Sequence, residues 1–485
     1  MQEDKRKGQQ MHRNNSRKSR YRKRQMTRIA VYAVLSVILI IAVIFLCIQL
    51  FGKKDNSDSP SGMTTEINPT ETEISPEEAA KAEKEALLEE ADRLAAGYDY
   101  DAAIALVKGY EGYSQDQELN NAILNYETTK STMVKYDPEQ VTHIFYHSLI
   151  ADTSLAFDGD QTERGYNQVM TTIEEFNKIT QEMYDRGYVL VSIHDLGHIE
   201  VQEDGTEKMV PGEIWLPEGK KPFVLSQDDV SYYHYMDGDG FATRIVIDED
   251  GKPTCEYVQP DGTVVTGSYD MVPLIDDFIE EHPDAAYRGA KGIIALTGYN
   301  GILGYRTNPV YDTGENLDSY QKAWLEAHPN YNFEQECADA KAVVEAMKAD
   351  GWEFASHSYG HRYYGQISDG DFEFDVTRWD ETVRPLLGDV DVMIYAFGDD
   401  IGDWRPYTSE NSRFTRLKGL GFDYFCNVDG SAEYWVQMGD NYIRQGRRNL
   451  DGNRMWEALS GGKNRLSDLF DVNEVFDPAR PTPVE

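Results

Sequence analysis

Two short segments of this 485-residue sequence end in side chains that can bind a metal ion. Asp228 and Asp229 follow one apolar run, and His357 and His361 follow another. If both runs are neighbouring strands of a parallel α/β fold, their carboxyl ends meet at one edge, where the active sites of such folds form. We therefore expect an oxygen ligand and two imidazoles around one point.

The predicted chemistry is that of an open catalytic zinc site. Asp229, His357 and His361 would leave one position free for water or a substrate oxygen. Zinc in such a site acidifies water and polarises a carbonyl, and Asp228, facing another way along its strand, would accept the proton as general base. Adjacent aspartates are common in acidic loops, and histidines four apart occur by chance in helices, but their joint occurrence after two strands favours a metal site.

The elements that must position these residues begin after Asp137, where short β-rich runs alternate with longer helical patterns. This alternation predicts parallel strands joined by crossover helices. Strands are predicted over residues 141–146, 188–192, 222–226, 292–296, 352–355, 390–397 and 422–428. Six or seven strands with helices between them predict a barrel-like α/β domain.

One stretch of this domain does not follow the alternation. Residues 243–266 contain two strand-like runs around Asp248-Glu-Asp-Gly251 and a further Asp-Gly pair at 261–262, which are hairpin turn signals. We interpret the region around 236–285 as an insertion built on a β-hairpin. It is either a lip that faces the substrate or a surface addition without a role.

The N-terminal part of the chain predicts a membrane anchor. Residues 1–28 form a basic head with 11 Lys and Arg and 2 Asp and Glu, whereas the whole chain has a net charge of −38. Residues 29–51 carry no charge and match the length of a transmembrane helix, and the positive-inside rule places the head in the cytoplasm. A cleaved signal peptide is the alternative, but the long basic lead favours an anchor. The acidic body excludes electrostatic binding of nucleic acid.

Between the anchor and the large domain lie a linker and a helical stalk. Residues 52–75 are rich in Asp, Asn, Ser, Thr, Pro and Glu, which is typical of a flexible linker. Residues 76–134 have apolar side chains at helical spacing and predict a short helical hairpin that is similar to part of a tetratricopeptide repeat. A spacer is the favoured interpretation of this stalk, and a protein partner is the alternative.

The segments that carry the metal-binding pattern resemble the polysaccharide deacetylase family, the NodB-homology domains. The similar segments are Ile144-Phe-Tyr-His-Ser-Leu149, Ser226-Gln-Asp-Asp-Val230 in place of the family's TFDDG, and His357-Ser-Tyr-Gly-His361 for its HSxxH. The resemblance implies a distorted (β/α) barrel of the NodB type over residues 137–477. It also implies Asp228 as general base and Zn²⁺ or another divalent metal on Asp229, His357 and His361.

The activity that the resemblance implies is hydrolytic removal of acetyl groups from an extracellular or cell-wall polysaccharide, most often one built on N-acetylglucosamine. With the predicted anchor, this places a single-pass protein in the cell membrane and its catalytic domain outside. Tyrosines 232, 233 and 235 follow the metal aspartates and could stack on sugar rings, although core packing explains them equally well.

The sequence departs from the family pattern in its later motifs. The family's YPYG appears as Tyr395-Ala-Phe-Gly398, from which Tyr395 and Phe397 are predicted to bind substrate, together with Arg448. No histidine follows His361, and arginine does not donate a proton readily at neutral pH. His147 is therefore the candidate acid, although a structural core histidine is the favoured interpretation of it.

If the chain has no catalytic acid, the alternative function is a non-catalytic glycan-binding protein on the same fold at the cell surface. A zinc protease is a more distant alternative, because the sequence contains no His-Glu-x-x-His. Two further histidines four residues apart, His194 and His198, have no strand-end partner and are predicted to be loop residues.

Overall fold

The computed structural model describes residues 75–484, so the predicted head, membrane span and most of the linker lie outside the described residues. Within 75–484, no helix is long and apolar enough to cross a membrane. The chain separates into two compact units, and the larger one, Ala79–Gln202 with Glu207–Glu485, contains the whole barrel.

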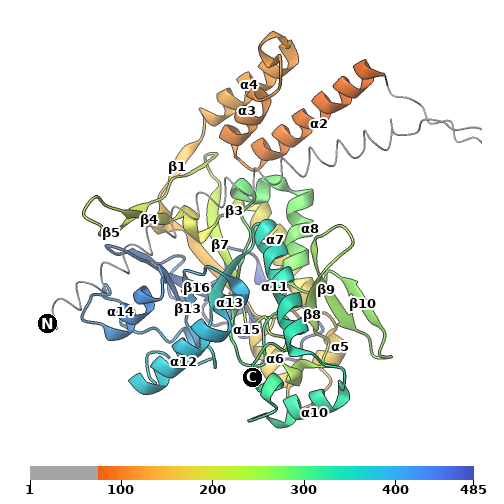
Figure 1. Ribbon diagram of the computed structural model, residues 1–485, viewed down its shortest axis with the longest axis vertical. Helices are drawn as coiled ribbons and strands as arrows, with labels where there is room; N and C mark the ends of the chain where they lie inside the picture. The colour runs from red at the N-terminus through yellow and green to blue at the C-terminus, as the bar shows by residue number, and fades with distance from the viewer. Residues whose placement is uncertain (1–74, 485) are drawn as a thin grey trace, which may run out of the picture. The chain divides into compact units, whose positions relative to one another are not determined.

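Seven parallel strands close into a barrel, so the predicted α/β class with a barrel is confirmed (Figure 1). Each strand of this ring pairs with a ring neighbour on both sides, which leaves no exposed edge. In ring order the strands are β7 (Lys221–Asp228), β11 (Ile293–Leu296), β12 (Glu353–Ser356), β13 (Val392–Ile394), β14 (Tyr424–Val428), β16 (Ile443–Asn449) and β2 (Thr142–Tyr146), which pairs with β7 again.

The ring differs from the predicted strand set at two places. β3 (Tyr188–Leu190), which the sequence predicted as one of the strands, pairs with β7 alone among the described strands and lies outside the ring. The seventh strand is β16, which the hydrophobic pattern did not predict. Its sequence Ile-Arg-Gln-Gly-Arg-Arg-Asn is polar, yet six of its seven residues are buried. Gln445 and Arg447 bond polar groups of neighbouring ring strands, and Arg444 and Arg448 pair with Asp400 and Asp468.

Alternate residues of the ring strands pack into two separate hydrophobic clusters. Leu225, Ile294 and Phe354 belong to the larger cluster, which includes the apolar faces of the surrounding helices. Ala295 and Ala355, one position along the same strands, belong to the second. This period of two is the geometry of an extended strand, in which successive side chains point to opposite faces.

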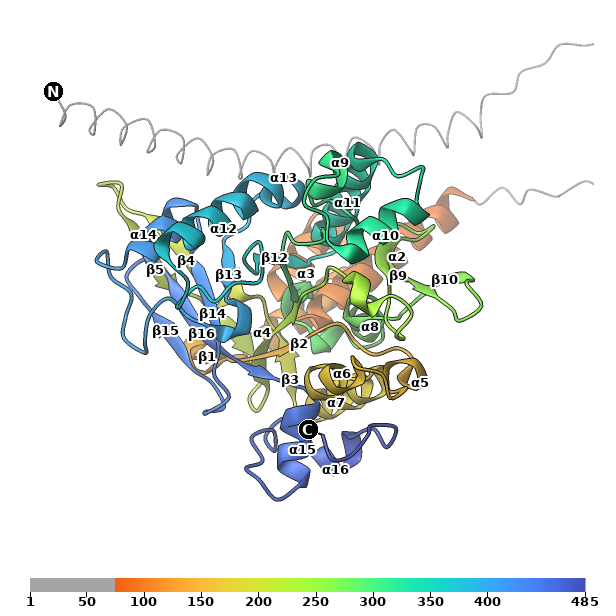
Figure 2. The same ribbon diagram turned by 90° about the horizontal axis from the view of Figure 1, so that it is seen from below.

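Helices cover the outside of the barrel, and Figure 2 shows α7, α8, α11 and α12 on different sides of its strands. Six of the covering helices are α7 (Ile173–Asp185), α8 (Met271–Glu281), α11 (Phe333–Ala349), α12 (Asp369–Thr382), α14 (Ser412–Gly419) and α15 (Gly452–Leu459). The other helices of this part of the chain are α5 (Thr153–Ala156), α6 (Glu163–Val169), α9 (Val310–Thr313), α10 (Ser319–Ala327), α13 (Arg384–Leu387) and α16 (Val472–Val475).

Helix α7 shows why these segments fold where they do. Thr172 and Glu175 form a capping box that satisfies backbone N–H groups at the start of the helix. Phe176, Ile179 and Met183 recur at helical spacing and are buried against the barrel wall. The cap fixes where the helix begins, and the apolar stripe fixes which face it buries.

The stalk predicted as a hairpin consists of three helices, α2 (Pro76–Ala96), α3 (Tyr100–Lys108) and α4 (Gln117–Lys130). A turn after α3 that includes Gly112, with a φ of 81°, separates the last two, and the sequence pattern did not show this break. Buried residues of all three helices belong to the same hydrophobic cluster as the second face of the barrel strands.

The remaining strands form small antiparallel sheets. The predicted hairpin insertion is a three-stranded sheet of β8 (Arg244–Ile247), β9 (Pro253–Val258) and β10 (Val264–Gly267), with tight turns at the two Asp-Gly sites. Two further pairs are β1 (Val134–Tyr136) with β6 (Ile214–Leu216) and β4 (Gly197–Val201) with β5 (Glu207–Pro211). β15 (Val436–Met438) adds to β16 from outside the ring.

Candidate metal centre

The structure brings Asp229, His357 and His361 together at the carboxyl ends of the barrel strands. Asp229 follows β7 and His357 follows β12, and both strands pair with β11 between them. Each of the three residues offers one ligand atom, and these atoms lie within 4.8 Å of one another. Two imidazoles and one carboxylate are the ligand set of an open catalytic zinc site, so these residues fit the predicted ion.

Hydrogen bonds orient the ligands before any ion binds. His357 is buried, and its Nδ1 lies 2.9 Å from the carbonyl oxygen of Ile394. Because a carbonyl can only accept, Nδ1 carries the proton and Nε2 is left with its lone pair for a metal. His361 Nε2 lies 3.4 Å from Asp229 Oδ2, which places these two donor atoms on the same side of the site.

The backbone at this centre is held in an unfavourable conformation. Asp229, Ser358 and His361 have φ angles of 62°, 61° and 51°, in the left-handed backbone region that residues other than glycine rarely adopt. Holding a residue in this backbone conformation costs about 1–3 kcal/mol of folding free energy, and residues held in this way cluster at functional sites. All three lie in the two segments that carry the metal-binding pattern.

A tyrosine that the sequence suggested only for stacking holds one ligand. Tyr233 donates a hydrogen bond of 2.8 Å to Asp229 Oδ1, and its hydroxyl also lies 2.8 Å from Thr297 Oγ1. Burial by itself would raise the pKa of Asp229. The positive charges of His361 and His357 outweigh this effect, so the net shift of the pKa is downward. Asp229 is therefore an ionised ligand whose Oδ1 is occupied and whose Oδ2 faces His361.

Asp228, the predicted general base, forms a buried ion pair with Arg447. The guanidinium of Arg447 donates two hydrogen bonds, of 2.7 Å to Asp228 Oδ1 and 2.8 Å to Oδ2. Burial alone would raise the pKa of Asp228, but Arg447 and then His357 lower it well below its usual range. Arg447 thus fixes the position of this carboxylate and keeps it ionised.

Arg447 is held by a chain of hydrogen bonds across the barrel interior. Gln445 donates from its amide nitrogen to the Val141 carbonyl, so its Oε1 accepts from His143 Nδ1 at 3.0 Å. His143 Nε2 then accepts from the Ser226 hydroxyl at 2.9 Å, and Ser226 Oγ accepts from Arg447 at 3.1 Å. Burial lowers the pKa of His143, as does Arg447, so this imidazole is neutral as the chain requires.

The predicted acid candidate, His147, lies beside the same centre. It follows β2, is half-buried, and interacts electrostatically with Asp228, Asp229 and Asp451. Asp451 is buried at the start of α15, where it accepts a hydrogen bond of 2.8 Å from the Arg454 backbone. Burial raises the pKa of Asp451. Asp451 was not predicted from the sequence, because its segment carries no motif.

The three residues predicted to bind substrate lie in different surroundings. Phe397 is 54% exposed, and its ring centroid lies 4.2 Å from that of His361. Tyr395 is buried, with its hydroxyl 3.2 Å from that of Tyr407. Arg448 is also buried and is paired with Asp468 at 2.6 and 2.8 Å. The structure therefore leaves Phe397 accessible to a substrate and gives Tyr395 and Arg448 packing partners instead.

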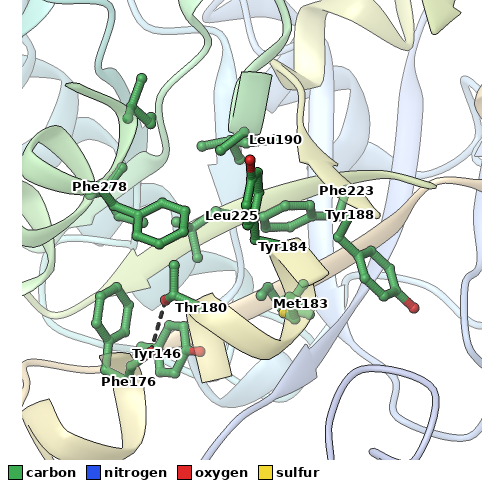
Figure 3. Close-up of a pocket in the computed structure, with 14 residues that line it drawn as sticks. Tyr146, Phe176, Thr180, Met183, Tyr184, Tyr188, Leu190, Phe223, Leu225 and Phe278 are labelled. Atoms are coloured by element: carbon green, nitrogen blue, oxygen red, sulfur yellow. Dashed lines mark hydrogen bonds between the residues drawn. The ribbon is translucent and has the colours of Figure 1, made fainter. Parts of the chain in front are cut away.

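A separate cavity lies outside the barrel wall, between α7, α8 and the strands β2 and β7 (Figure 3). Its volume is about 30 Å³, and Phe176, Met183, Leu225 and Phe278 are among its lining residues. The Thr180 hydroxyl in its lining donates a hydrogen bond to the Phe176 carbonyl. The cavity contains no metal-binding pattern and is a packing feature of the helix layer.

Comparison with known proteins adds little to this geometry. No protein-family model matches the sequence, and no curated protein does. One solved structure that is similar to this chain is the Streptococcus pyogenes deacetylase PplD in complex with acetate, with 12% identity and a TM-score of 0.34 over 70% of this chain and 100% of that chain. A TM-score this low supports no conclusion about this chain. The structure by itself shows a parallel β/α barrel in which Asp229, His357 and His361 could hold a metal ion.

Proposed function

We propose that this protein is a metal-dependent hydrolase that removes acetyl groups from a polysaccharide, with an N-acetylglucosamine glycan as the preferred substrate. One observation carries the proposal. Asp229, His357 and His361 converge within 4.8 Å beside Asp228, whose carboxylate Arg447 holds with two hydrogen bonds. An open metal site next to a fixed, ionised carboxylate is the arrangement that hydrolysis of an acetyl group needs.

Each residue of the site has a separate role in the proposed reaction. Bound zinc at Asp229, His357 and His361 would supply Lewis acidity toward the acetyl carbonyl and toward water. Asp228 accepts the proton of the attacking water. Arg447, which donates a hydrogen bond to each oxygen of this carboxylate, keeps it in place. His147 follows β2, the strand that pairs with β7, and delivers a proton to the leaving nitrogen or oxygen; its electrostatic interaction with Asp451 favours the protonated imidazole that this step needs.

The location of the substrate follows from the sequence. If residues 29–51 anchor the chain in the cell membrane with its body outside, the polymer within reach is an extracellular or cell-wall polysaccharide. The net charge of −38 favours a neutral glycan over nucleic acid or a polyanion. The three-helix stalk would then serve as a spacer or bind a protein partner.

The test is acetate release by the purified full chain in detergent solution, loaded with zinc, from chitohexaose and from a small acetyl ester. We expect zinc to bind at one equivalent and turnover to require it. His361→Ala removes a ligand and should abolish both, whereas His198→Ala, an exposed histidine of β4, should change neither.

Two further variants separate catalysis from binding of the metal. Asp228→Asn should retain zinc and lose at least a hundredfold in turnover, the scale of general base catalysis. His147→Gln should retain zinc and lose activity on the amide more than on the ester, because an amine is the poorer leaving group. Bound zinc without acetate release from either substrate would instead support the glycan-binding alternative.

A further inference from the structure

A buried carboxylate interrupts the apolar face of α12. The buried residues of this face recur at helical spacing and are Phe372, Asp375, Val376 and Trp379. A carboxylate in such a stripe costs free energy unless hydrogen bonds replace the water that it loses on folding. The bonds that Asp375 makes therefore decide why a charged side chain is kept at this position.

The Asp375 carboxylate is bonded to the loop that carries both histidine ligands. Its Oδ1 accepts a hydrogen bond of 2.7 Å from the Tyr359 backbone N–H, and its Oδ2 accepts one of 2.9 Å from the Gly360 backbone N–H. Both N–H groups lie between the two histidines in the sequence. A third bond, of 2.8 Å, comes from the Tyr364 hydroxyl to Oδ1. Because bonds to a carboxylate are about twice as strong as neutral ones, Asp375 restrains the backbone between the two ligands.

The loop after β11 holds the same backbone from another direction. The Tyr359 carbonyl accepts hydrogen bonds of 3.0 and 2.9 Å from the backbone N–H groups of Gly298 and Tyr299. On either side of the bonded peptide group, Ser358 and His361 have φ angles of 61° and 51°. A backbone in this left-handed region persists only where its surroundings hold it there. The carboxylate and the β11 loop together supply that restraint.

Helix α12 is itself fixed to the rim of the barrel. The carbonyl oxygen of Leu296, the last residue of β11, accepts hydrogen bonds of 3.0 Å from the His357 backbone and 2.9 Å from the Trp379 indole. Trp379 lies one turn beyond Asp375 on the same buried face. The position of Asp375 is thus set relative to the strand end from which the ligand loop begins.

We propose that Asp375 is a positioning residue of the metal centre. By bonding the two backbone N–H groups between His357 and His361, it sets the separation and orientation in which these imidazoles meet a metal ion. This inference rests on the metal centre of the proposed function and deepens it, since it adds a residue that acts on the ligands through the backbone. Loss of these bonds should therefore change the geometry of the bound metal.

The test is titration of the metal-free full chain in detergent solution with Co²⁺, whose visible absorption depends on ligand geometry, and with Zn²⁺ in competition with a chromophoric chelator. Asp375→Asn keeps the size of the side chain but turns an amide donor toward a backbone N–H group. We expect zinc affinity to fall about 10- to 100-fold and the cobalt bands to change in position and intensity. An affinity within twofold of the unmodified chain with an unchanged cobalt spectrum would overturn the inference.

Two control variants separate positioning from a general loss of stability. Tyr364→Phe removes the third bond of the same carboxylate and leaves the two backbone bonds intact. Asp276→Asn alters another buried carboxylate, which pairs with Lys291 and bonds the Trp352 indole directly before the amino end of β12. It should lower the melting temperature. Both controls should keep the cobalt spectrum and zinc affinity of the unmodified chain, and a change in either control equal to that in Asp375→Asn would refute the positioning role.

Gly360→Ala tests the same contact from the loop if Asp375→Asn does not fold. The added Cβ would lie 3.1 Å from Asp375 Oδ2, so the carboxylate must move by a few tenths of an ångström. We expect a smaller change of the cobalt bands and a smaller loss of zinc affinity than in Asp375→Asn. An unchanged spectrum in Gly360→Ala would also overturn the inference.

Acetate release from chitohexaose separates this inference from the proposed function. Metal binding that depends on Asp375, without acetate release by the zinc-loaded unmodified chain, would uphold the positioning role and refute the deacetylase activity. Acetate release by the unmodified chain, with normal metal binding in Asp375→Asn, would uphold the activity and refute the positioning role. A chain that binds neither Co²⁺ nor Zn²⁺ would refute both.

Discussion

Replacement of Tyr233 by Phe removes one oxygen atom and tests whether this residue fixes a metal ligand. The hydroxyl donates a 2.8 Å hydrogen bond to the charged Asp229 carboxylate, and such bonds contribute about 1.5–3 kcal/mol. Since about 1.4 kcal/mol is a factor of ten in a binding constant, zinc affinity should fall about 10- to 100-fold. Loss of an outer partner of a metal ligand has effects of this size.

The rest of the site should tolerate this change. The phenyl ring keeps the stacking with Tyr235, and the Thr297 hydroxyl, which loses its tyrosine partner, lies 3.3 Å from Ser231 Oγ. Asp229 keeps Oδ2 toward His361 but loses the bond that restrains its rotation. The effect should therefore appear in zinc affinity and leave the unfolding midpoint of the metal-free chain nearly unchanged.

The assay is competition for zinc between the full chain and a chromophoric chelator at neutral pH. Tyr395→Phe is the matched control, because it removes the same oxygen from a buried tyrosine whose hydroxyl bonds Tyr407 and no metal ligand. An affinity for Tyr233→Phe within twofold of the unmodified chain, or an equal loss in Tyr395→Phe, would refute the orienting role of Tyr233.

Three predictions concern the frame around the site. Arg480→Met strands the fully buried carboxylate of Glu175, so the free energy of unfolding should fall by about 3–5 kcal/mol in urea titrations, and a fall below about 1 kcal/mol contradicts this. Burial lowers the pKa of His194, but Glu353 and Asp391 raise it to a net value well above normal. Protonated His194 therefore contributes its full stabilisation below the pKa of the unfolded state, about 6.5, and this stabilisation is lost as the pH rises through the pKa of the folded state. The melting temperature should fall less with rising pH in His194→Gln than in the unmodified chain. Leu225→Ala enlarges the cavity of Figure 3 and should cost about 2–5 kcal/mol by the same titrations; a cost under 1 kcal/mol would mean that the helices close the gap.

The convergence of the three candidate metal ligands could be predicted from the sequence because their signal is local. Asp229 and His357 each end an apolar strand, and parallel strands bring such ends to one rim whatever the details of the loops. His361 follows His357 by four residues in the same loop. Strand periodicity and residue type were therefore sufficient to place these three side chains together.

The partners of these residues could not be predicted in the same way. Arg447 and Gln445 lie on β16, whose polar sequence has no hydrophobic alternation, so neither this strand nor the bonding partners of the two side chains were predicted. His143 was read as part of an apolar strand, and its neutral state depends on burial and on Gln445, 302 positions away. A hydrogen bond between distant segments leaves no trace in the local pattern of either segment.

The sequence by itself determined the α/β class, the strands that carry the metal ligands and the residue types that can bind an ion. These follow from the period of two in a strand and from the chemistry of carboxylate and imidazole. Only the tertiary structure decided that Arg447 pairs with Asp228, that Tyr395 and Arg448 are buried, and that the Phe397 ring lies against His361. Barrel closure brings residues from distant strands within bonding distance, and burial then sets which side chains are exposed and which groups are ionised.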